Sequence, residues 1–223
     1  TWRMMYQGVQ PTRSTTVQVT DSIGNLEAYA EVDKDLANLN GNTEAFRLSE
    51  DAAHIEGMNK EMAATLFYGD ERLAPAEFTG LAPRFNDSSA ENASQLINAG
   101  GTSNLTSIWG VVWGPNTVHG LYPKGSTGGL SFRDLGEVTI ENIDGNGGRM
   151  QAYRSHYKWQ CGLTVRDWRY VYRICNVDTT GLFTESDGVL ENAKKLVRLL
   201  IEASERLSRM LKRKGIEHEV LSG

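Results

Sequence analysis

The sequence has no long apolar run, and this absence excludes a membrane protein built from helices. No stretch approaches the roughly 18 consecutive apolar residues that a membrane-spanning helix needs, so we expect no membrane partner. The N-terminal stretch TWRMMYQGVQP has no long apolar segment, so it does not fit a signal peptide. With 39% hydrophobic and 23% charged residues in 223, the composition indicates a globular chain that can bury a substantial core.

Cysteine and histidine are scarce, which excludes most metal centres and disulfide scaffolds. Cys161 and Cys175 fit either one disulfide or two free thiols, and two cysteines in a chain this long favour a reducing compartment. None of the four histidines stands at metal-ligand or catalytic-triad spacing. We therefore predict no metal site, no cofactor and no enzymatic activity.

Two glycine-rich stretches have the outline of ligand-binding loops but lack the required residues. DGNGG at 144–148 is followed by Arg149 where a calcium-binding EF-hand needs Gly, and Ser155 stands where its Glu belongs. GPNTVHG at 114–120 lacks the Lys-Ser/Thr ending of a phosphate loop. DGNGG is instead predicted to be a hairpin turn between strands at 136–143 and 149–159.

The net charge of −5 conceals two regions of opposite sign. Residues 15–91 carry fifteen Asp/Glu against five Lys/Arg, about −10, whereas residues 189–214 carry eight Lys/Arg against three Glu, about +5. Opposite charges on one chain favour head-to-tail contact between copies, or one face turned towards a polyanion. Two separately solvated charged helices fit the same counts.

The first half of the chain predicts a projecting hairpin and a long helix. Residues 1–39 lack helical periodicity, and Gly24-Asn25 is predicted to be the turn between two strands. Residues 43–69 predict a helix that begins at Asn42-Thr43 and stops at Gly69, and Gly57 within it indicates tight packing or a bend. Its expected apolar seam consists of Leu48, Ala52, Ile55, Met62 and Leu66, with Asp51 on a wetter face.

The second half predicts strands followed by a helix, so the fold class is α+β. A short helix is expected at 92–98, and the apolar run at 107–113 predicts a strand buried on both faces. A strongly amphipathic pattern predicts a helix at 189–214, ended by Gly215, and a further strand at 216–221.

The stretch GLTVRDWRYVYRI at 162–174 predicts a single strand with Arg, Trp and Tyr on both faces. These residue types are enriched in the cores of protein–protein interfaces. Aromatic side chains next to Arg residues, as in and near this stretch, are also typical of sites that stack the bases of single-stranded nucleic acid. The acidic composition of the chain argues against nucleic-acid binding as its main role. We expect Arg166, Asp167 and Arg169 to form ion pairs between subunits or between strands. The candidate inter-subunit contacts are Arg166, Asp167, Trp168, Arg169, Tyr170 and Tyr172.

Five stretches together are more specific than any of these motifs. They are FRLSEDAAHIEGMNKEMAATLFYG at 46–69, FTGLAPRF at 78–85, IWGVVWGPNTVHGLYPKG at 108–125, LGEVTIENIDGNGGRMQAYRSHYKW at 135–159 and GLTVRDWRYVYRICNVD at 162–178. In this order and spacing they resemble the major capsid protein of tailed double-stranded DNA phages, which has the Hong-Kong-type capsid fold. The tail SERLSRMLKRKGIEHEVL resembles a segment of bacterial preprotein-translocase motor ATPases, so a chimeric continuation after residue 178 stays open.

The resemblance implies a division of the chain into four parts. These are an extended β-hairpin loop at 1–42, a spine helix at 43–69, a β-rich peripheral domain at 70–180 and the start of an incomplete or atypical axial domain at 181–223. An encapsulin-like compartment shell shares this architecture and is the first alternative. A carbohydrate-binding β-rich module that uses the tryptophans is the second.

The resemblance also implies a structural role and a set of partners. The chain would be a major capsid subunit that self-assembles through pentamers and hexamers into an icosahedral phage head enclosing double-stranded DNA. Implied partners are further copies of the chain, DNA held non-specifically, and scaffolding, portal or decoration proteins. The implied location is the virion, after assembly in the host bacterial cytoplasm.

Overall fold

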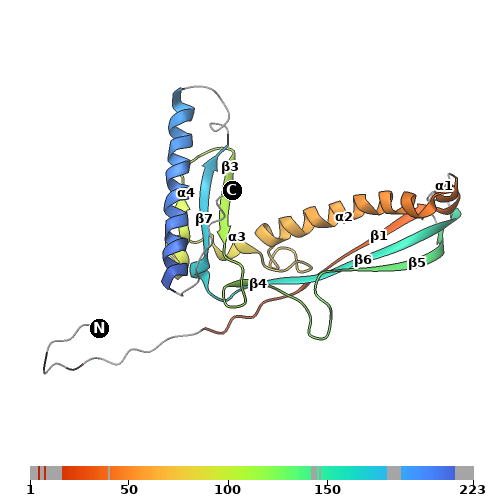
Figure 1. The fold of residues 1–223 in the computed structure, drawn as a ribbon, viewed down its shortest axis with the longest axis horizontal. Coiled ribbons are helices and arrows are strands. Elements are labelled where there is room, and N and C mark those ends of the chain that lie inside the picture. The colour runs from red at the N-terminus through yellow and green to blue at the C-terminus, as the bar shows by residue number, and fades with distance from the viewer. Residues whose placement is uncertain are drawn as a thin grey trace.

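In the computed structural model the chain forms two slender regions that meet at a corner (Figure 1). The structure describes residues 5, 8, 17–39, 41–141, 145, 147–179 and 187–213, with side chains of the last helix described only at 194–208. The first region, the arm, contains β1 (Gly24–Asp33), α1 (Lys34–Asn38), α2 (Thr43–Tyr68), β4 (Val118–Leu121), β5 (Leu130–Glu141) and β6 (Arg149–Val165). The second, the upright module, contains β2 (Leu96–Asn98), β3 (Leu105–Val111), β7 (Val171–Asp178) and α4 (Asp187–Arg213). The connecting elements are α3 (Leu81–Arg84) and the 3₁₀ turns η1 (Glu91–Gln95) and η2 (Trp168–Tyr170).

The arm is an antiparallel sheet with α2 along one face (Figure 1). β6 is its central strand, since β1, β4 and β5 all pair with it. The predicted hairpin between the last two long strands is confirmed, because Glu141 of β5 pairs with Arg149 of β6. Within its turn, Gly145 and Gly147 adopt positive φ angles of 75° and 84°, which glycine accommodates without strain.

The predicted N-terminal hairpin is wrong. Gly24 and Asn25 are the first residues of β1, where they pair with Cys161 and Gln160 of β6. Residues 17–23 form no strand. The alternation along β1 turns residues such as Ala30 towards α2 and residues such as Glu31 towards solvent, and a distant strand supplies the ladder. Long-range pairing therefore overrides the local turn preference of Gly-Asn.

The long helix is confirmed as α2, but the predicted apolar seam is rotated. Met58 and Thr65 are buried, whereas Leu48 is 68% exposed. Asp51, predicted on a wet face, is only 5% exposed. Seam residues Ile55, Met62 and Leu66 are half-buried and Ala52 is exposed. The buried face of α2 includes Asp51 because two hydroxyl groups of the sheet donate hydrogen bonds to its carboxylate.

Two glycines of the α2 region differ in what surrounds them. A side chain at Gly57 would meet no atom within 4 Å, so the predicted tight packing there is wrong. At Gly69, by contrast, a Cβ would lie 2.5 Å from the Phe78 carbonyl oxygen and 2.7 Å from the Thr65 carbonyl oxygen. Helix α2 therefore ends where the chain needs a residue without a side chain.

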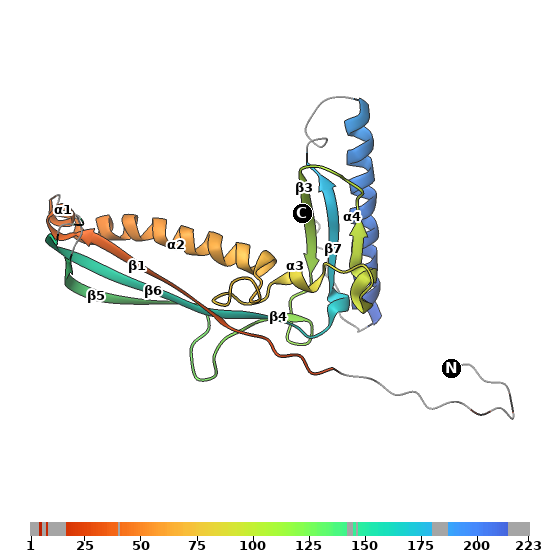
Figure 2. The ribbon, with the colours of Figure 1, turned by 180° about the vertical axis from the view of Figure 1, so that it is seen from behind.

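In the upright module, α4 covers one face of a sheet ordered β2-β7-β3 (Figures 1 and 2). Ile97, Ile174, Val177 and Ala203 form its buried cluster. The predicted amphipathic helix is confirmed at the described positions of its seam, with Ala203 fully buried and Leu196 and Leu200 packed against the cluster. Gly215 and the predicted strand at 216–221 lie outside the described residues. The predicted short helix at 92–98 is instead η1 followed by β2.

A further cluster of buried residues lies at the corner and joins the two regions. Phe78, Leu81 and Phe85 from the segment around α3 meet Val118 and Leu163 of the arm. Val171 of β7 completes the cluster from the upright module. The predicted strand at 107–113 corresponds to β3, but its described residues are half-buried and Trp113 is 55% exposed, so it is not covered on both faces. None of the described helices is long and apolar enough to cross a membrane.

Candidate functional site

The predicted single strand at 162–174 is interrupted by a tight corner. β6 ends at Val165, and the backbone N–H groups of Arg166 and Asp167 both donate to the Thr117 carbonyl oxygen, at 2.8 and 3.4 Å. The Asp167 carboxylate then accepts the N–H of Arg169 at 3.1 Å, which starts η2. Asp, whose side chain caps its own turn, stops the strand here.

The corner distributes the six candidate contact residues unevenly. Arg166 and Arg169 are exposed, while Trp168 is half-buried against the corner cluster. Tyr170 is only 2% exposed and is buried by its own chain, so it offers no surface to another subunit. The ring of Tyr172 lies over Gly110 of β3, where a Cβ would come within 2.1 Å of it.

Ion pairing at the corner is local. Asp167 and Arg169 form a bidentate pair, with Nη2 at 2.7 Å and Nε at 2.8 Å from the carboxylate. This contact holds the Asp167 carboxylate in the turn and raises the pKa of Arg169. Arg166 donates instead to the Pro115 carbonyl oxygen at 3.1 Å. The structure therefore brings Asp167 and Arg169 together within one turn, and it places the Arg166 guanidinium against the segment at Pro115.

A buried polar network, which the sequence did not reveal, fastens α2 to the sheet. The Asp51 carboxylate accepts hydrogen bonds from Ser155 Oγ at 3.0 Å and Tyr157 Oη at 2.9 Å. Beside it, Arg47 binds Asp134 of β5 in a bidentate pair and contacts Ser155 Oγ at 3.3 Å. Burial, with the Asp51 contact second, raises the pKa of Tyr157 to about 12, and the Arg47 contact lowers the pKa of Asp134.

The opposite face of the arm is charged, and its charges pair with one another across β1 and β6. Arg154 of β6 forms an ion pair with Glu31 of β1 at 2.6 Å. His156 Nε2 and Lys158 Nζ both contact Glu27, at 3.1 and 3.0 Å, and these contacts, Lys158 first, lower the pKa of the Glu27 carboxyl. Facing strands thus cancel each other's charge.

The arm also exposes large apolar side chains. Leu36 and Leu39 near the α1 end are 54% and 75% exposed, and Leu48 of α2 is 68% exposed. Phe132, on the outer strand β5, is 59% exposed. A row of exposed apolar groups along a thin projection is typical of surfaces that another protein covers.

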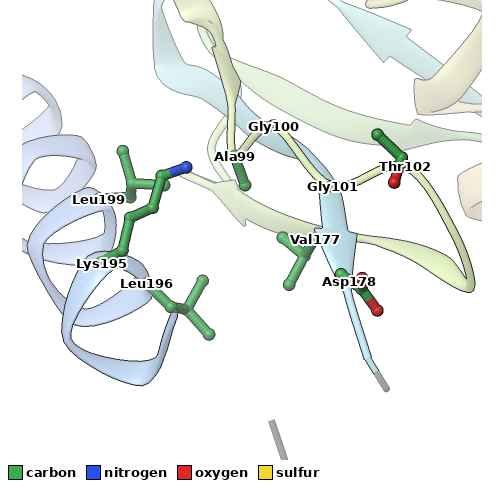
Figure 3. A pocket seen from close by; sticks show the side chains of 9 residues that line it. All are labelled: Ala99, Gly100, Gly101, Thr102, Val177, Asp178, Lys195, Leu196 and Leu199. Atoms are coloured by element: carbon green, nitrogen blue, oxygen red, sulfur yellow. The ribbon is translucent and has the colours of Figure 1, made fainter. Parts of the chain in front are cut away.

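The structure supplies no catalytic arrangement within its described part. A cavity of about 170 Å³ lies between α4 and the end of β7, with Lys195 on one wall and Asp178 on the other (Figure 3). It contains no nucleophile paired with a base. Cys161 and Cys175 are free thiols, and burial raises the pKa of Cys161. Among the described residues no three His, Cys, Asp or Glu side chains cluster as a metal site.

An elongated chain that exposes large apolar side chains along its arm is typical of proteins that assemble with other copies or partners. Comparison with known proteins agrees with this class. A chain in the near-atomic cryo-EM structure of bacteriophage epsilon15 is similar at a TM-score of 0.54 with 39% sequence identity, over 87% of this chain and 60% of that one. No curated protein matches. The model of the family "Major capsid protein GP7" matches residues 1–217, and the chain belongs to this family. The match includes α4, so the helix after residue 178 is part of the family's sequence.

Proposed function

We propose that the chain is a structural subunit that self-assembles into the icosahedral head of a tailed phage. The match to the major capsid protein family over residues 1–217 carries this proposal. The chain spans 60% of the length of the epsilon15 chain. We therefore propose the partners of the subunit together with its function. These are further copies in pentamers and hexamers, double-stranded DNA held non-specifically, and scaffolding, portal or decoration proteins. Its location would be the virion, after assembly in the host cytoplasm.

The geometry supports this function because a lone copy is poorly covered. In the described part of the chain, most buried apolar residues fall into three separate clusters. The arm is only one helix and one sheet thick (Figure 2). Neighbouring copies in a shell would cover the exposed side chains of α1, α2 and β5.

Within the Hong-Kong-type architecture, we assign the arm to the peripheral domain and α2 to the spine helix. The upright module, whose sheet shares its core with α4, would be the axial domain. This assignment shifts the boundary that the sequence placed near residue 180, because β7 and α4 pack together. Arg166 and Arg169, at the exposed corner, remain candidates for contacts between copies.

The family match does not favour the two alternatives. A carbohydrate platform would need tryptophans gathered on one face, but Trp109 and Trp168 pack against the corner cluster. Trp159 packs against a buried cluster in the arm, which consists of Ala30, Met58 and Tyr157. Electron microscopy of the purified full-length protein tests the proposal: shells or capsomer rings are expected. A monodisperse monomer at high concentration under assembly conditions would contradict it.

A further inference from the structure

An apolar pocket with two carboxylates in its lining lies between α2, the start of β1 and residues 76–78. It has a volume of about 220 Å³, and Leu26, Met62 and Phe78 are among its lining residues. Glu61 and Glu77 are its charged lining residues. None of the described residues forms an ion pair with either carboxylate. We refer to these five residues as the acidic pocket.

The outer face of α4 has the complementary composition. Val197 and Ile201 are 54% and 53% exposed, although large aliphatic side chains usually lie inside. Lys194 and Arg198 are exposed. Lys194, Val197, Arg198 and Ile201 follow the spacing i, i+3, i+4, i+7, which places the four side chains on one helix face. No described residue forms an ion pair with Lys194 or Arg198. We refer to these four residues as the basic face.

The two surfaces cannot meet within one copy. α4 lies on the far side of the upright sheet from the arm in both views (Figures 1 and 2). The acidic pocket lies on the arm, between α2, the start of β1 and residues 76–78. Contact between them therefore requires two copies.

We propose that the basic face of α4 docks into the acidic pocket of a second copy, which deepens the proposed function and rests on it. Val197 or Ile201 would fill the apolar floor, and the cations would reach the two carboxylates. Matching charges select the partner and its orientation. Because the two surfaces differ, the contact is head-to-tail, and such contacts close into rings when the rotation permits.

Charge reversal tests the contact. The pocket-reversed chain carries Glu61→Lys and Glu77→Lys, and the helix-reversed chain carries Lys194→Glu and Arg198→Glu. Each should lower the assembled fraction, measured by sedimentation and electron microscopy, by roughly tenfold or more, the factor that about 1.4 kcal/mol gives. The chain with all four changes should assemble again, since every contact is complementary once more.

Mixing the two reversed chains adds a stricter readout. In a mixture each reversed pocket can meet only a reversed helix, so the two chains must alternate around a ring. Even-membered rings should form, and five-membered rings should not, because an odd ring leaves one mismatched contact. The matched control is Glu50→Lys with Glu91→Lys, which makes the same charge change at exposed positions outside the pocket and should leave assembly intact.

The outcomes separate the two proposals. Wild-type shells without recovery in the fourfold variant would overturn the docking contact and leave the capsid function standing. Absence of wild-type assembly would remove both. Circular dichroism checks that each variant is folded. Where a reversed chain is not, Glu61→Gln with Glu77→Gln keeps the side-chain size and should still weaken assembly; unchanged assembly in that variant would overturn the contact.

Discussion

In the arm, the contact between helix and sheet combines a small apolar cluster with the buried Asp51 carboxylate and two hydroxyls, whereas in the upright module the cluster is built from aliphatic side chains. An aliphatic contact tolerates small shifts because burial has no direction. A buried carboxylate tolerates none, since each lost hydrogen bond leaves a desolvated polar group. The comparison shows how one chain can combine an arm of fixed geometry with a more adaptable module.

The largest effect is expected at the corner, where the two regions share one cluster. Phe85 is 1% exposed there, and Phe85→Ala should lower the free energy of unfolding by about 3–5 kcal/mol. Urea unfolding followed by tryptophan fluorescence measures the loss. Leu73→Ala is the control, because Leu73 is 86% exposed and should change stability by less than about 0.5 kcal/mol. Equal effects of the two changes would show that the corner does not couple the regions.

The second effect is a loss of stability that arises in the arm alone. Asp51→Ala leaves the hydroxyls of Ser155 and Tyr157 without their acceptor and should cost about 1–3 kcal/mol. Adding Ser155→Ala and Tyr157→Phe removes the two hydroxyl donors that lack an acceptor, and it should recover part of the lost free energy of unfolding. The same denaturation measurement applies. No recovery in the triple variant would mean that Asp51 acts through packing alone.

The third effect is a pH dependence confined to the arm. The pKa of Tyr157 rises from an ordinary value near 10 to about 12. A group with a raised pKa stabilises the fold fully below its ordinary pKa, and this contribution disappears as the pH rises from about 10 through about 12. Ultraviolet titration of the wild type and of Tyr157→Phe should differ by one tyrosine that ionises above pH 10 in the folded wild type. Identical titration curves for the two chains above pH 10 would contradict the raised pKa of Tyr157.

The smallest effect is a gain. Gly57 lies within α2 with nothing near its missing side chain, so Gly57→Ala should stabilise the chain by up to about 1 kcal/mol. Gly69→Ala is the matched comparison and should destabilise, because its Cβ would meet backbone atoms at 2.5 Å. Thermal melting of both variants measures the difference. A loss of stability in Gly57→Ala would mean that α2 needs flexibility at that point.

Elements with strong local signals were predictable from the sequence. The residues 43–69 predicted α2 within one residue, because a long window without Pro and a terminal Gly agree, although the structure shows no side-chain capping hydrogen bond at Asn42. The glycine-rich turn between β5 and β6 was predictable for the same reason, since DGNGG permits the positive φ angles that a tight turn uses. The helix face of α4 followed from its strong periodicity.

The errors arise where a distant contact decides the outcome. Gly24-Asn25 resembles a turn, but pairing with residues 160 and 161 of β6 makes it a strand. Asp51 resembles a surface residue until Ser155 and Tyr157, more than a hundred positions away, supply hydrogen bonds. Of the candidate contacts, Tyr170 was placed wrongly, because the Asp167 turn redirects the chain and buries its ring. The acidic pocket and basic face appeared in the sequence only as a charge asymmetry.

β6 runs unbroken over seventeen residues, beginning at the turn with β5 and ending next to the corner. Its hydrogen bonds to β1 and β5 lie across the strand direction, so a pull along the strand loads many of them at once. A pull along the strand at the free end would therefore be carried to the corner by many hydrogen bonds together. In a shell of such subunits, each arm would resist tension along its length in addition to the contacts between copies.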